Sequence, residues 1–236
     1  MTFRDRLIGT LRRLRPVLEE PGVLVVGSEV PNLLQPGAAS TLVVSQDVDL
    51  AIPVGRVEAL KEKLRLLVDF IPSTEEPSVF LPRSPDLIEA NFLGLDLTIR
   101  EASETYVLDD PELPLMTFGP LGLLRPGPVI EIDGLRVPLP RPADLMVEKL
   151  LTDRTGEKGA RDLLVVAGLL TASPRADADE LVTVARGLSP ESRHAIRSSL
   201  TVLSLMDHVP GMPDPAPLRH EIARLLAEIE KEAGVG

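Results

Sequence analysis

The chain has no cysteine and no tryptophan, and only one tyrosine and five phenylalanines among its 236 residues. The absence of cysteine excludes disulfides, a thiol nucleophile and cysteine-ligated zinc sites. The scarcity of aromatic side chains argues against the stacking platforms that bind single-stranded nucleic acid. The core is therefore expected to be aliphatic, which the hydrophobic content of 44% allows.

The sequence also lacks any apolar run of about 18 residues, the length typical of a transmembrane helix, so we expect no membrane association. The opening segment MTFRDRLIGTLRRLRP is too charged for a secretory signal, which favours a cytoplasmic protein. The formal net charge of −11 argues against salt-driven binding of nucleic acid over the whole surface. It does not exclude a local basic patch.

The hydrophobic pattern of the sequence changes near residue 138. Before it, short β-rich segments alternate with helical ones, and after the segment PLPRP helical periodicity continues to the end. The length suits one large domain or two small ones. We therefore expect an α+β fold, with a mixed β-sheet and flanking helices over residues 1–138 and a helical domain over residues 139–236.

Hydrophobic spacing and turn residues define the expected elements. Helices are expected over residues 3–20, from Pro31, and over 55–71, 142–154 and 157–170, with two or three more after them. Strands are expected over 23–26, 41–52 and 86–100, and a hairpin over 129–139 that turns at Asp133-Gly134. Residues 103–128 are rich in proline and glycine and give no clear prediction. The apolar face of strand 86–100 is expected to be Leu93, Leu95, Leu97 and Ile99.

The segment LVVSQDVDLAIP, residues 42–53, carries two acids inside an apolar run. Residues two apart in a strand point to the same side, so Ser45, Asp47 and Asp49 share one face while Val48 and its apolar neighbours face the core. Two adjacent carboxylates repel each other and are costly on a half-buried strand unless a cation balances them. Mg²⁺, or Mn²⁺ in its place, prefers such oxygen ligands together with substrate phosphates.

A second feature is the Gly27-Ser28 turn between an expected strand and a helix start. Glycine lets a phosphate approach the backbone closely, and a helix N-terminus supplies N–H donors. A third acid, Asp96 on the strand 86–100, is expected either to complete a metal site or to take a proton from an attacking hydroxyl. Together these residues suit phosphoryl or nucleotidyl transfer.

The order VVGS, SQDVDL, GLDLTI resembles the nucleotidyltransferase-fold superfamily. The later segments DLMVEKLLTDR and KGARDLL are similar to motifs of AbiEii-type toxin nucleotidyltransferases. The resemblance implies that Asp47, Asp49 and Asp96 are catalytic and hold the metal. It also implies that the nucleotide contacts are Gly27, Ser28, Ser45, Lys149, Arg154, Lys158 and Asp162. The segment before the acids, TLVVSQDVDL, has valines where many relatives carry an arginine.

Three functions stay open at this point. The first is a metal-dependent nucleotidyltransferase that uses an NTP and modifies an RNA end such as that of tRNA, a protein or a small molecule, with an antitoxin as expected partner. The second is a catalytically inactive fold that senses nucleotides or binds a protein, as an antitoxin does. The third is adenylylation of a cationic small molecule, which the acidic chain would suit. For Lys158 and Asp162, four apart on a helix, a surface ion pair is the structural alternative.

Overall fold

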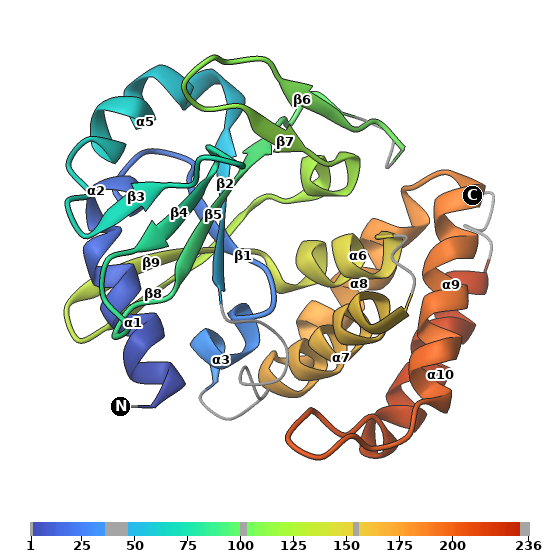
Figure 1. Ribbon diagram of the computed structural model, residues 1–236. Coiled ribbons are helices and arrows are strands. Elements are labelled where there is room, and N and C mark those ends of the chain that lie inside the picture. Colours follow the sequence, from blue (N-terminus) through green and yellow to red (C-terminus); the bar gives the residue numbers. More distant parts are fainter. Residues whose placement is uncertain (1, 36–46, 100–102, 153–155, 232–236) are drawn as a thin grey trace. The chain divides into compact units, whose positions relative to one another are not determined.

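We describe a computed structural model of residues 2–35, 47–99, 103–152 and 156–231 (Figure 1). The chain forms two compact units, which are treated separately below. The first contains the residues up to Glu29 and those from the acidic strand to Pro140, and the second contains α3 (Val30–Leu34) and the residues from Arg141 onward. The sequence predicts a continuous first domain up to residue 138. The structure instead groups α3 with the second unit, because α3 packs against α7 (Gly156–Ala172).

The first unit is a mixed sheet with short helices. Its helices are α1 (Phe3–Arg13), α2 (Arg15–Leu18) and α5 (Val57–Leu64), and its 3₁₀ turns are Val54–Arg56 and Gly119–Leu123. Its strands are β1 (Leu24–Val26), β2 (Asp47–Pro53), β3 (Phe70–Pro72), β4 (Val79–Pro82), β5 (Glu89–Leu95), β6 (Tyr106–Leu108), β7 (Leu115–Thr117), β8 (Pro126–Ile132) and β9 (Leu135–Pro140).

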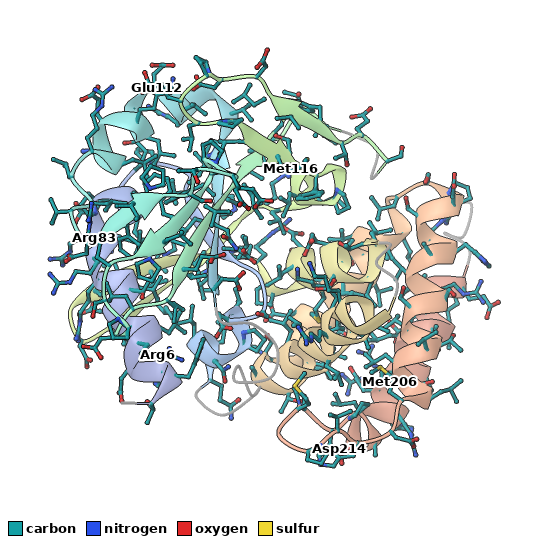
Figure 2. All side chains as sticks on the ribbon, in the orientation of Figure 1. Arg6, Arg83, Glu112, Met116, Met206 and Asp214 are labelled. Atoms are coloured by element: carbon teal, nitrogen blue, oxygen red, sulfur yellow. The ribbon has the colours of Figure 1, made fainter. Side chains whose placement is uncertain are left out.

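The main sheet has the order β1-β2-β5-β4-β3, which can be followed in Figure 1. Strand β2 pairs antiparallel with β1 and parallel with β5, while β4 pairs antiparallel with β5 and with β3. The β6–β7 hairpin joins the sheet through β7, whose Met116 is exposed and labelled in Figure 2. The expected α+β class with a mixed sheet is therefore confirmed in the described part of the chain.

Two predicted elements of this unit have different bounds in the structure. The helix predicted over residues 55–71 ends at Leu64, and Phe70–Pro72 is strand β3, because this segment pairs with β4. The helix predicted over residues 3–20 is interrupted at Leu14. Pro16 has no N–H to continue the helical hydrogen bonds, which explains the break.

The predicted hairpin after these elements is confirmed. Strands β8 and β9 pair antiparallel around Asp133 and Gly134, whose φ angles are 50° and 76°. Two successive positive φ angles are the requirement of the two-residue turn that Asp-Gly favours. The Arg12 guanidinium donates a 2.8 Å hydrogen bond to the Asp133 carboxylate, which ties the turn to α1.

The predicted apolar face of β5 is confirmed only at Leu95, which is buried, and the residues of the opposite face provide the other buried positions. Ala90 and Phe92 are buried, whereas Glu89, Asn91 and Leu93 are half-buried. The strand also ends at Leu95, so Leu97 and Ile99 are not part of it. The alternation was misassigned because the leucines that follow Phe92 suggest an apolar face that continues beyond the end of the strand.

The second unit is helical. It contains α3, α6 (Pro142–Leu151), α7, α8 (Arg175–Arg186), α9 (Pro190–Leu205), the 3₁₀ turn Ala216–Leu218 and α10 (Arg219–Glu230). On α7, Ala160 is exposed and Leu163 half-buried, whereas Asp162, Leu164, Val166 and Ala167 are buried. None of the helices in the described part is both long enough and apolar enough to span a bilayer.

The core of the sheet gives a direct stability test. Phe92 on β5 is 1% exposed and meets Phe80 of β4 edge to face, with ring centroids 5.0 Å apart. We expect Phe92→Ala to lower the free energy of unfolding by about 3–5 kcal/mol, since the site cannot collapse fully around the lost ring. Urea denaturation measures this, and Val107→Ala, at a position 52% exposed, serves as the control. Equal losses in both variants would contradict the described packing.

Candidate functional site

The two aspartates of β2 lie on one face of the strand, as predicted. Asp47 and Asp49 are half-buried, while Val48, Leu50 and Ile52 between and beyond them are fully buried. Ser45, which the sequence places on the same face, lies outside the described residues. The alternation explains how an apolar strand carries two charges: its buried face secures the strand in the sheet, and its other face presents the acids.

A neighbouring amide links the two carboxylates. Asn91 of β5 stands directly opposite Asp49 in the parallel register, and its Nδ2 donates to Asp47 Oδ2 at 2.7 Å and to Asp49 Oδ1 at 3.1 Å. A charge-assisted hydrogen bond fixes each carboxylate in position. Asn91 Oδ1 is buried and has no hydrogen-bond partner within the described part of the chain. The amide therefore orients the acids but leaves an oxygen with unused bonding capacity.

Gly27 gives Asp49 the space it occupies. Val26 pairs with Asp49 across the β1–β2 ladder, so the Gly27-Ser28 turn follows β1 beside the aspartates. Gly27 has φ +87°, and a Cβ added there would lie 2.5 Å from Asp49 Oδ2. Both the backbone conformation and the close approach require glycine. The predicted adjacency of the Gly-Ser turn and the paired acids is thus present in the structure.

Glu29 is a third acid near the pair, and the sequence did not single it out. Its side chain is 1% exposed, Oε1 accepts a 3.3 Å hydrogen bond from the Ser28 hydroxyl, and Oε2 has no hydrogen-bond partner among the described residues. Burial raises the pKa of Glu29 to about 8. The hydrogen bond from Ser28 opposes this rise, and the charges of Asp47 and Asp49 add to it.

Glu89 adds a fourth carboxyl at the other side of the pair. It stands opposite Asp47 in the β2–β5 register and is half-buried. Burial raises its pKa, and the charges of Asp47 and Glu76 raise it further. The aspartate face of the sheet therefore gathers acids from β2, from β5 and from the turn after β1.

Asp96 does not join this group. The residue follows the end of β5, about 16 Å along the chain direction from Asn91 at the rise of an extended strand. Its carboxylate accepts hydrogen bonds from the Thr98 N–H and hydroxyl and from the Tyr106 hydroxyl. These bonds, the Thr98 hydroxyl first, hold its pKa below the ordinary value. Asp96 thus lies beyond the end of β5 and is held by Thr98 and Tyr106, which disfavours the predicted role of third metal carboxylate.

The remaining predicted residues belong to the second unit. Lys149 of α6 is buried, with its Nζ 3.2 Å from Glu148 Oε2 and 3.5 Å from Asp162 Oδ1 of α7. The surface ion pair between Lys158 and Asp162 is replaced by this buried one, because α7 turns Asp162 inward while Lys158 is exposed. Arg154 lies outside the described residues. Within this unit the structure brings Lys149 and Asp162 together.

A sequence signal existed for two of the missed residues. Glu89 and Asn91 are two apart in the strand segment EANF, the same spacing that identified Asp47 and Asp49. The leucines of the following segment suggest a different core face and hide this signal. Glu29 gave no such signal, since one acid after a turn is ordinarily exposed.

The residues beside the pair fit a hard divalent cation. Mg²⁺ is commonly held by one or two carboxylates and completes its shell with water and substrate phosphates, which Asp47 and Asp49 can accommodate. The unpartnered oxygens of Glu29 and Asn91 are of the same hard type. Over the described residues, no three acids or histidines are arranged as a preformed metal cluster.

The contact between Gly27 and Asp49 predicts a graded effect of alanine. Gly134→Ala introduces an unfavourable positive φ where no atom lies within 4 Å of the added Cβ, and Gly55→Ala has neither problem. We expect no loss of stability for Gly55→Ala, about 1–2 kcal/mol for Gly134→Ala, and a larger loss for Gly27→Ala. Denaturant unfolding of the three variants tests this order. Similar losses for Gly27 and Gly134 would contradict the close approach of Asp49.

The burial of Glu29 predicts a dependence of stability on pH. Its pKa rises from 4.5 to about 8 on folding, so the folded protein retains the proton across this range. The resulting stabilisation is complete below about pH 4.5 and is lost as the pH rises to about 8, with a slope of up to about 1.4 kcal/mol per unit. Glu29→Gln should lack this slope in metal-free buffer. Unfolding curves of the wild type, Glu29→Gln and Glu131→Gln from pH 5 to 8 measure this slope. Glu131 is exposed, so Glu131→Gln should follow the wild type. Parallel pH dependences of stability in all three proteins would refute the assignment.

Comparison with known proteins adds no family assignment. No protein-family model matches the chain, and no curated protein matches it in sequence. Its function is therefore inferred from the residues and their geometry.

Proposed function

We propose that the protein is a metal-dependent nucleotidyltransferase that transfers a nucleoside monophosphate from an NTP to a hydroxyl acceptor. One observation supports this most strongly: Asp47 and Asp49 are oriented by Asn91 and packed against the side-chain-free backbone of Gly27. A pair of like charges on a half-buried strand is unfavourable by itself. The hydrogen bonds from Asn91 and the space left by Gly27 hold the pair in place, as expected if the pair binds a cation.

Asp47 and Asp49 would hold Mg²⁺ or Mn²⁺, which when bound neutralises phosphate charge and polarises the phosphorus–oxygen bonds. Asn91 holds both carboxylates in a fixed orientation, so little reorganisation is needed on substrate binding. The half-buried Ser28 hydroxyl, which donates to Glu29 in this structure, would turn to donate to a phosphate oxygen when the nucleotide binds. In the transfer, the acceptor oxygen bonds to the α-phosphorus, the bond to pyrophosphate breaks, and the acceptor proton leaves to solvent.

The short helix after the turn has no part in this proposal. Helix α3 has only five residues, so the predicted phosphate contact at a helix N-terminus is replaced by the Gly27-Ser28 backbone and hydroxyl. The acceptor classes suggested by the toxin resemblance are an RNA end, a protein and a small molecule, and a cognate antitoxin is the matching partner. Lys149 and Asp162, as a buried charged pair in the second unit, are retained as proposed nucleotide contacts.

A second candidate function is a catalytically inactive fold that binds nucleotide or protein. Asn91 favours it, because this neutral amide stands opposite Asp49, where a third carboxylate on the adjacent strand would complete a metal site. This candidate predicts nucleotide binding without turnover, or no nucleotide binding. A thermal shift with each of four NTPs, with and without Mg²⁺, separates binding from its absence, since a ligand that binds the folded state raises the melting temperature.

The catalytic proposal is tested by transfer of label from α-³²P NTPs to tRNA, to the protein itself and to aminoglycosides. Asp47→Asn and Asp49→Asn should each lower the transfer rate by about 100-fold or more, as expected when several kcal/mol of charge stabilisation are lost. Asp96→Asn is the matched control and should retain transfer, because Asp96 lies beyond the end of β5 and bonds to Thr98 and Tyr106. Transfer that survives Asp47→Asn and Asp49→Asn would refute the proposed roles, and nucleotide binding without label on any acceptor would favour the inactive fold.

A further inference from the structure

Glu29 is the buried acid that the proposed roles above leave unused. It occupies the position after the Gly27-Ser28 turn, where the chain leaves β1 beside the aspartates of β2. Its side chain is 1% exposed, and the charges that act on it are those of Asp47 and Asp49. Glu29, in the turn after β1, therefore interacts electrostatically with the two acids of β2.

The hydrogen bonds of Glu29 do not account for its burial. Oε1 accepts one long bond, 3.3 Å, from Ser28, and Oε2 has no hydrogen-bond partner among the residues that the structure describes. A buried polar atom without a partner costs about 1–3 kcal/mol, and a buried charge costs more. An apolar residue or a glutamine would fill this position at lower cost. A structural role alone therefore does not explain a carboxyl here.

Glu29 itself forms no ion pair with a basic side chain among the described residues, and no basic group acts on its pKa. The ion pairs of the first unit involve other acids, such as Lys61 with Asp110 and Arg56 with Glu20. A buried acid next to two more acids is stabilised by a cation, and hard carboxylate oxygens select Mg²⁺ or Mn²⁺ over softer metals. The unpartnered Oε2 atom is the one available for such a bond.

Asn91 provides a second observation that is consistent with a bound metal ion. Its Oδ1 is also buried and without a partner among the described residues, while its Nδ2 contacts both aspartates. Two side chains that interact with the aspartates, one from the turn after β1 and one from β5, thus each carry a buried oxygen without a partner among the described residues.

We propose that Glu29 is the third carboxylate ligand of the metal ion held by Asp47 and Asp49, an assignment that rests on the proposed function. It takes the place that the sequence gives to Asp96. Glu89 is the weaker alternative, since it is half-buried and can reach water for its remaining bonds. The consequence is that the turn after β1 and the strand β2 together determine metal affinity, before any nucleotide binds.

The test is a Mn²⁺ titration of the full chain without nucleotide, with free Mn²⁺ measured by electron paramagnetic resonance. Glu29→Gln keeps the shape of the side chain and should weaken Mn²⁺ binding by about tenfold or more, as expected for loss of a ligand. Glu29→Asp retains the charge and should lie between Glu29→Gln and the wild type. Exposed Glu131→Gln should bind as the wild type does. Thermal unfolding in metal-free buffer verifies that each variant is folded.

The outcomes separate this inference from the proposed function. Equal Mn²⁺ affinity in the wild type and in Glu29→Gln would overturn the role of Glu29, and the proposed function would stand if label transfer still required Asp47. Absence of Mn²⁺ binding by the wild type would overturn both. Weaker binding in Glu29→Gln with rescue by Glu29→Asp would support the assignment.

Discussion

The parallel pairing of β2 with β5 is the constraint on which the candidate site depends. It sets Asp47 opposite Glu89 and Asp49 opposite Asn91, so that polar residues of two strands separated by about 40 positions share one face. A shift of the register by one residue would turn Val48 and Ala90 toward this face and bury the acids. The fully buried side chains on the opposite face prevent such a shift, since moving them into water would forfeit their burial.

The site is locally unfavourable and depends on the surrounding sheet. Its acids repel one another, Glu29 is buried with little hydrogen bonding, and Gly27 adopts a conformation that other residues avoid. The apolar contacts of Leu50 and Phe92 stabilise the same strands from the other side. Stable packing on one face thus holds unfavourable groups on the other face. This is typical of functional sites, where groups are held in positions that they would not take by themselves.

In the second unit, buried acids lie beside basic side chains. Lys149 lies between Glu148 and Asp162, and Arg141 contacts Asp144 and Glu180, so each buried acid of these groups has a basic neighbour. Removing one partner from such a group leaves an uncompensated buried charge, which is strongly destabilising. In the sheet unit, by contrast, the carboxyl of Glu29 is buried, the charges of two further acids act on it, and its Oε2 has no hydrogen-bond partner among the described residues. This buried oxygen supports the proposal of a cation at the sheet.

The sequence by itself determined the α+β class, the acidic strand, the Asp-Gly hairpin and the helical nature of the chain after residue 140. Local spacing is sufficient for these features, because alternation, turn residues and helical periodicity act over a few neighbours. Only the tertiary structure decided which acids meet. Strand β5 ends before Asp96, Asp162 is buried against α6, and Glu29 and Asn91 are brought to the aspartates by pairing between distant strands. Strand pairing in a sheet depends on the burial of whole strand faces, so a short stretch of sequence does not reveal which strands pair.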